Sequence, residues 1–161
     1  MEALYSAFDS IGESLHIFYC LALLLAVYKY REVNSTIICI TVLCVMELLM
    51  NQISNPLLLS GTLEIWYGAW ILCYSATVYL LYKTHRVLKV NLAKLVNTVA
   101  FAHVVLSFTQ AFRYVDRAFL GGEHLDMWYY LAINSLNISV ALIVLFTLVR
   151  EKEEKRVGLY I

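Results

Sequence analysis

Five mostly apolar segments, separated by short polar ones, make up most of this chain. They span about residues 10–28, 35–54, 63–82, 92–112 and 127–149. One helical crossing of a bilayer core needs about 20 apolar residues, so each segment predicts a transmembrane α-helix. The composition agrees, because 61% of the residues are apolar and only 15% are charged, unlike an ordinary soluble domain. We therefore predict an all-α, polytopic transmembrane helix bundle that forms a single domain over residues 1–161.

The first apolar segment is the weakest of the five. Its uninterrupted apolar part, 15–28, is short and reaches membrane-spanning length only when residues 11–14 are included. Four transmembrane helices therefore remain a second possibility. The segment does not resemble a cleaved signal peptide, because residues 1–14 hold three acidic residues and no Lys or Arg, whereas a signal peptide begins with a basic region.

The positions of Lys and Arg predict the orientation in the membrane. Ten of the twelve follow the first, third and fifth segments, and the other two lie in 113–126. Cations near helix ends are retained on the cytoplasmic side, so we predict an outside N-terminus and a cytoplasmic C-terminus. Residues 150–161 then form a short charged cytoplasmic tail. The expected location is the plasma membrane or a bacterial inner membrane.

Motifs for cofactors, metals and catalysis are not found in the sequence. The four cysteines lie inside predicted helices without CxxC spacing, which is typical of packing residues. The four histidines do not place two rings at one depth, as bis-histidine haem ligation would require. No glycine-rich phosphate loop is present. We therefore predict no cofactor, no metal site, no catalytic residue and no nucleic-acid partner.

Glu47 lies inside the second apolar segment, where a charge is costly. Insertion of a charged side chain at such a depth costs about 2.5–3.5 kcal/mol, so Glu47 must face protein or water rather than lipid. Cys44, Glu47, Asn51 and Ser54 recur at intervals of three and four residues, which places them on one helix face. We expect this face to be buried in the bundle.

A second polar stripe runs along the fourth segment, with His103, Ser107 and Gln110 on one face. At about 1.5 Å per residue, His103 reaches nearly the same depth as Glu47, so the two could pair. Other polar residues of the third and fifth segments reach this depth from the opposite side. We call the whole set the mid-membrane polar layer: Glu47, Asn51, Ser75, His103, Ser107, Asn134 and Asn137.

The segment between the fourth and fifth apolar runs carries five charges that nearly balance. They are Arg113, Asp116, Arg117, Glu123 and Asp126. We expect a locally neutralised external loop, in which the charges are either solvated, as surface ion pairs often are, or used to dock an external partner.

Two functions from different classes fit these features. In the first, which we favour, the polar layer is interhelical hydrogen-bond glue, and the protein is a non-enzymatic subunit of a homo- or hetero-oligomeric membrane assembly. Its partners are then the lipid bilayer and either copies of itself or a larger membrane protein. In the alternative, the layer around Glu47 lines an ion or proton path in an oligomeric channel. A small transporter or an intramembrane enzyme is less favoured.

Overall fold

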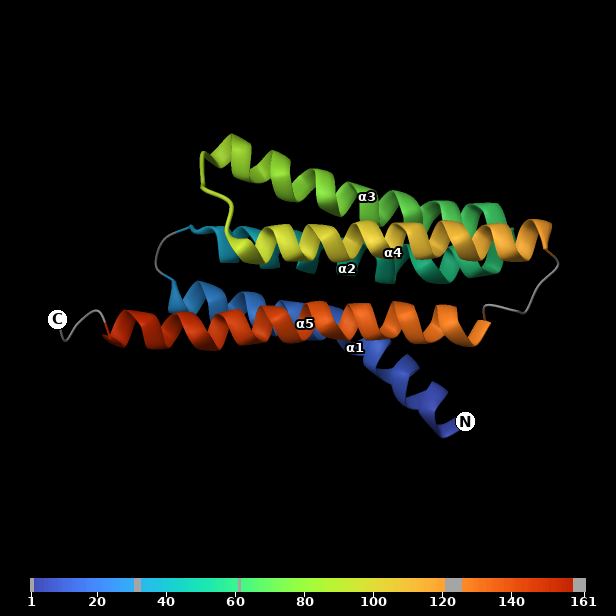
Figure 1. Cartoon of the computed structure of the whole chain (residues 1–161), viewed down its shortest axis with the longest axis horizontal. Coiled ribbons are helices and arrows are strands. Elements are labelled where there is room, and N and C mark those ends of the chain that lie inside the picture. The colour runs from blue at the N-terminus through green and yellow to red at the C-terminus, as the bar shows by residue number, and fades with distance from the viewer. Residues whose placement is uncertain (1, 31–32, 61, 121–125, 158–161) are drawn as a thin grey trace.

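The protein is an all-α helical bundle. A computed structural model describes residues 2–30, 33–60, 62–120 and 126–157, and no strand occurs in these ranges. The five helices are α1 (Glu2–Lys29), α2 (Ser35–Ser60), α3 (Leu63–Leu88), α4 (Lys94–Phe119) and α5 (Asp126–Val157) (Figure 1). The predicted fold class is therefore confirmed.

Four of these helices are long and apolar enough to cross a membrane. Within the described residues the candidate spans are Ser35–Ile53, Glu64–Leu88, Lys94–Phe119 and Asp126–Arg150. Helix α1 runs over Glu2–Lys29, and the apolar stretch described within it is Ser14–Lys29. The chain is thus a membrane-embedded, multi-pass protein with four candidate spans among the described residues.

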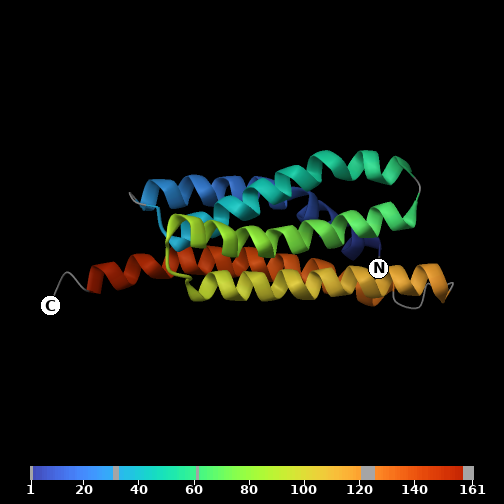
Figure 2. The same ribbon diagram turned by 90° about the horizontal axis from the view of Figure 1, so that it is seen from above.

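The helices close into a ring in chain order. Each helix packs on the next, α5 returns to α1, and α2 also touches α4 across the bundle. Figures 1 and 2 show α5 running alongside α1, with α3 and α4 side by side. Small or slender side chains such as Ala26, Cys39 and Val144 are fully buried where helices meet, and small residues allow such close helix approach in membranes.

The outer surface of the bundle is apolar. Phe101, Phe108 and Phe146 are each more than 60% exposed, and a soluble protein rarely leaves large apolar side chains exposed over a wide area. In a bilayer the same side chains contact acyl chains at no cost. The small side chains buried between helices and the large apolar side chains on the outer surface are therefore both expected of a membrane helix bundle.

The helix ends differ from the predicted ones. Four helices extend beyond the predicted C-terminal boundaries of 28, 54, 82 and 112, and α5 continues to Val157 instead of 149. Apolar composition marks only the part of a helix in hydrocarbon, whereas backbone hydrogen bonds keep the helix intact beyond it. At the end of α3 the stop signal is local, because Lys89 adopts a left-handed conformation (φ 54°) and its N–H donates to the carbonyls of the preceding turn.

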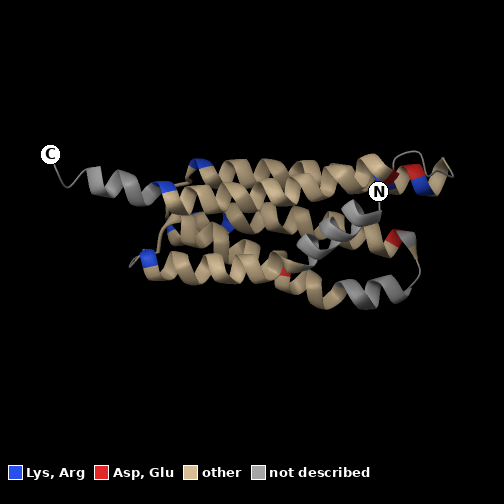
Figure 3. Cartoon of the chain, turned by 90° about the horizontal axis from the view of Figure 1, so that it is seen from below, with Lys and Arg blue, Asp and Glu red and all other residues tan. Residues whose placement is uncertain are grey.

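Charged residues gather at the two ends of the bundle (Figure 3). Lys29 ends α1, Arg86 lies in the last turn of α3, and Lys94 begins α4, so these cations lie at one end. Figure 3 shows acidic and basic residues together at the opposite end. The long middle of the bundle carries few charges, as hydrocarbon requires.

A buried histidine ties three segments together at the cation-rich end. The Nδ1 of His85 donates to the carbonyl of Leu81 at 2.6 Å, and Nε2 then accepts from the hydroxyl of Ser35 at 2.8 Å. The same hydroxyl oxygen accepts the backbone N–H of Ala93 at 3.0 Å. His85 therefore joins the start of α2, the end of α3 and the loop before α4, a role that the sequence reasoning did not assign to it.

Candidate functional site

Glu47 lies on α2 at the junction with α1 and α3. It is half-buried within the single chain, and it acts electrostatically on Tyr19 of α1 and on Tyr74 of α3. Among the described residues, no hydrogen bond or ion pair involves its carboxyl group. Glu47 thus lies within electrostatic range of two tyrosines, without a salt-bridge partner in the described part of the chain.

His103 lies on α4 and is only 5% exposed. Its Nδ1 donates to the carbonyl oxygen of Val99 at 2.8 Å, because a carbonyl can only accept. The proton of the neutral ring is therefore on Nδ1, which leaves Nε2 as an acceptor. The ring packs edge-on against Tyr74 with 5.7 Å between ring centroids.

The expected direct pair between Glu47 and His103 does not occur among the hydrogen bonds and ion pairs of the described residues. Tyr74 interacts with both Glu47 and His103. It is buried, packs on His103, acts electrostatically with Glu47 and forms a side-chain hydrogen bond with Asn137 of α5. The residues that we expected to meet directly are therefore grouped around a tyrosine.

The other residues of the mid-membrane polar layer do not form a single cluster. Ser75 and Ser107 meet hydroxyl to hydroxyl at 3.5 Å and join α3 to α4. Asn134 donates instead to the carbonyl of Tyr130 within its own helix, at 3.0 Å. Asn51 is exposed on the surface of the single chain, so only part of the predicted stripe on α2 is buried.

Tyr74 is the member of this cluster that sequence reasoning missed. Tyrosines in membrane proteins are enriched at the membrane interface, where the ring is buried and the hydroxyl reaches water. Tyr74 lies near the middle of α3, so its hydroxyl cannot reach either interface and needs a protein partner. The distance of a tyrosine from both helix ends is the signal that would have identified it.

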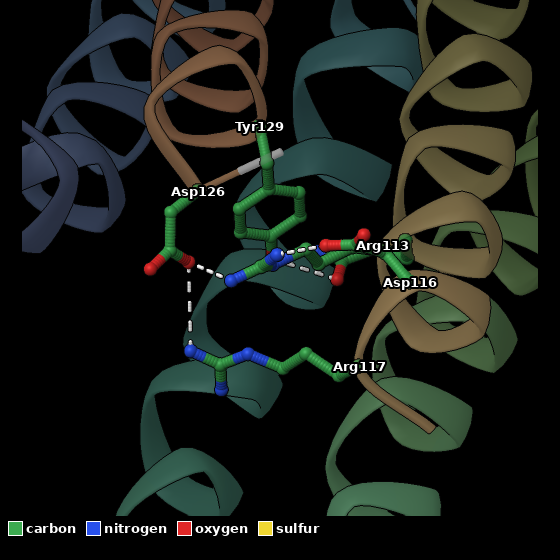
Figure 4. Close-up of polar contacts among 6 residues, drawn as sticks. Arg113, Asp116, Arg117, Asp126 and Tyr129 are labelled. Carbon is green, nitrogen blue, oxygen red and sulfur yellow. Dashed lines mark hydrogen bonds and ion pairs between the residues drawn. The ribbon is translucent and has the colours of Figure 1, made fainter. Parts of the chain in front are cut away.

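A second polar cluster lies at the opposite end of the bundle from most of the cations (Figure 3), and Figure 4 shows its contacts. The guanidinium of Arg113 pairs with Asp116 one turn on and with Asp126, the first residue of α5. Arg117 lies 3.5 Å from the same Asp126 carboxylate. We call these four residues the outer ion-pair cluster, after the side of the membrane that the sequence predicts for them. The cluster fastens the end of α4 to the start of α5.

Aromatic packing supports this cluster. The ring of Tyr129 lies against the Arg113 guanidinium, with 5.7 Å between Cζ and the ring centroid, a favourable cation–π arrangement. Its hydroxyl donates to Oε1 of Gln110 at 2.8 Å, and Tyr67 of α3 packs on the same ring at 6.3 Å. The α4–α5 junction is thus anchored to α3 as well.

The predicted external loop is corrected in two respects. Arg113, Asp116 and Arg117 belong to α4, which continues to Phe119, so they are helical. Arg113 and Asp116 are 1% and 2% exposed, so the solvated interpretation is wrong for them, because each side chain is neutralised by a charge inside the protein. Asp126 is 52% exposed, and Glu123 lies outside the described residues.

Two hollows accompany the clusters. One, of about 390 Å³, lies between α3 and α4 beside Ser75 and His103. The other, of about 380 Å³, lies at the outer ion-pair cluster and is lined mainly by aromatic side chains and two arginines. Within the described residues, no group of three or more His, Cys, Asp or Glu is placed to hold a metal ion. Comparisons with known proteins find no matching family model, no similar curated protein and no similar solved structure.

Proposed function

We propose that this multi-pass membrane protein acts as a non-enzymatic scaffold subunit of a membrane assembly. The observation that supports the proposal most is that buried polar groups at three depths engage other groups of the same chain. His85 does so at the cation-rich end, Tyr74 in the middle, and Arg113 at the outer ion-pair cluster. Polar groups used in this way hold helices together rather than bind a substrate.

The energetic argument favours packing over transport. Each interhelical hydrogen bond contributes about 0.6–2 kcal/mol in a membrane, so a few of them fix which helix faces meet. A conducting path would instead need polar groups left open to water along the whole crossing. The hollow between α3 and α4 and the hollow at the outer ion-pair cluster share no lining residue, which gives no support to a continuous path between them.

The exposed face of α5 suits assembly with another membrane helix. Leu142, Leu145 and Val149 are 41–59% exposed and recur at intervals of three and four residues along it, so a partner helix can pack on this apolar row. We assign the N-terminus to the outside and the C-terminus to the cytoplasm, because the cation-rich end of the bundle is then retained inside. This orientation belongs to the proposal.

The mass of the detergent-solubilised particle tests the subunit role. A tagged protein extracted from its native membrane in a mild detergent should form a particle larger than the 18.5 kDa chain, containing either several copies or a second protein in fixed ratio. A single chain in every mild detergent would contradict the proposal.

One observation favours an ion or proton path as a second candidate. The Glu47 carboxyl group has no salt-bridge partner among the described residues, although it lies at mid-membrane depth. Glu47→Gln keeps the size of the side chain and its hydrogen-bonding capacity but removes the titratable group. Loss of flux in this variant, with flux retained in the exposed-site control Glu64→Gln, would favour the second candidate.

A further inference from the structure

The hollow between α3 and α4 opens on the surface that faces lipid. Phe108 and Val104 line it and are 61% and 39% exposed, respectively. Its volume of about 390 Å³ is within the size range of small-molecule sites. A molecule dissolved in the lipid can therefore enter this hollow laterally from the membrane.

The groove has an apolar wall and a polar strip. Ile71, Val78 and Phe108 supply the wall, while Ser75, Ser107 and His103 supply the strip. This combination of a largely apolar lining with a few fixed polar groups is typical of ligand sites. The lining contains no charged side chain, so a charged headgroup would find no countercharge there.

The Nε2 atom of His103 is a hydrogen-bond acceptor that a ligand in the groove can use. Its Nδ1 is occupied by the Val99 carbonyl, and none of the hydrogen bonds of the described residues uses Nε2 of this 95% buried ring. Among the described residues, Nε2 is not one of the fully buried side-chain atoms without a partner, so it keeps some accessible surface. An acceptor that faces lipid without a donor is costly. An O–H donor entering the groove would satisfy Nε2, and the two serine hydroxyls beside it could hold a second oxygen.

The depth of the groove within the membrane limits which classes of ligand can bind there. Ser107 lies near the middle of the 26-residue α4, about 18–20 Å from either helix end at 1.5 Å per residue. Phospholipids keep their polar groups at the headgroup level, so they bring only acyl chains to this depth. A neutral aromatic ring with a hydroxyl group is apolar enough to reach it.

We propose that the α3–α4 groove binds a lipid-soluble phenol or quinol, whose hydroxyl group donates to Nε2 of His103 and whose ring packs against Phe108. The assignment is independent of the scaffold role, because a subunit and a channel could each carry such a site.

Two matched probes test the assignment. 4-Nonylphenol carries an O–H donor, and its methyl ether has nearly the same shape without one. Binding to the full-length protein in lipid nanodiscs is measured by equilibrium dialysis, with empty nanodiscs correcting for partition into lipid. One hydrogen bond to an acceptor in the apolar groove should make the phenol bind about tenfold tighter than the ether.

Substitutions in the groove test whether the preference for the phenol over the ether arises there. His103→Phe keeps an aromatic ring and should abolish the preference for the phenol, whereas His16→Phe, on α1, should leave it unchanged. Ala111→Phe places a bulky side chain in the groove lining and should weaken both probes. Equal binding of phenol and ether to the wild type, or a preference that survives in His103→Phe, would overturn the proposal.

A measurement on the wild type guards against a variant that fails to fold. In protein labelled with ¹⁵N-histidine, the phenol should shift the resonance of Nε2 of His103 and the ether should not. A shift absent with the phenol, or the same with both probes, would also overturn the assignment.

Discussion

Replacing Arg113 by alanine should destabilise the bundle strongly, because it leaves Asp116 buried without its countercharge. Arg113 and Asp116 are 1% and 2% exposed, so water cannot replace the guanidinium. Breaking a buried ion pair by removing one partner costs about 3–5 kcal/mol, which at 1.4 kcal/mol per factor of ten lowers the folding constant by roughly 10²–10⁴-fold. Loss of the contact with Tyr129 adds to this.

The matched control is Arg117→Ala. Arg117 is 42% exposed and lies 3.5 Å from Asp126, so solvent screens most of its interaction and the cost should be below about 1 kcal/mol. Reversible unfolding in mixed micelles of mild detergent and dodecyl sulfate, followed by circular dichroism, measures both variants. The double variant Arg113→Ala with Asp116→Ala should regain part of the lost stability, because no buried charge is left alone.

Two results would refute this reasoning. If Arg113→Ala is no less stable than Arg117→Ala, the guanidinium is not buried in a critical ion pair. If the double variant is less stable than Arg113→Ala alone, the cost comes from lost packing rather than from an orphaned charge.

Three further predictions concern contacts between helices. His85→Phe should lower the free energy of unfolding by about 1–3 kcal/mol, because it leaves the buried Ser35 hydroxyl without its acceptor; an unchanged unfolding curve would contradict this. Cys20 and Cys44 lie sulfur to sulfur at 3.3 Å, so mild oxidation with copper phenanthroline should form an intramolecular disulfide detectable by peptide mass mapping, and its absence would argue against the packing of α1 on α2. Tyr74→Phe should cost about 0.6–1.7 kcal/mol through the lost hydrogen bond to α5, and a variant as stable as the wild type in the same unfolding assay would remove the tyrosine from the centre of the cluster.

The sequence predicts the helices well because the bilayer imposes their length and composition. Apolar segments locate all five helices. The cost of a mid-membrane charge likewise placed Glu47 against protein. These predictions follow from the solvent, which one sequence is enough to reveal.

The partners of the polar groups could not be predicted in the same way. The sequence indicates that Glu47 and His103 lie at the same depth in the membrane. Which side chains meet, however, depends on the rotation of each helix about its axis, and in the structure Tyr74 interacts with both residues. The burial of Arg113 was missed because a charge near a helix end is usually solvated. Its burial depends on Asp116, Asp126 and the ring of Tyr129 together, which come from two helices.

The central claim, that the mid-membrane polar groups hold helices together and conduct nothing, is tested most directly by ion and proton flux. Wild-type protein and Glu47→Gln are reconstituted into liposomes at equal density, and the size of the assembled particle is checked for both. We expect both to assemble alike and to leak no faster than protein-free liposomes. Wild-type flux above that background, lost in Glu47→Gln while assembly is retained, would contradict the scaffold role and assign a conducting path to Glu47.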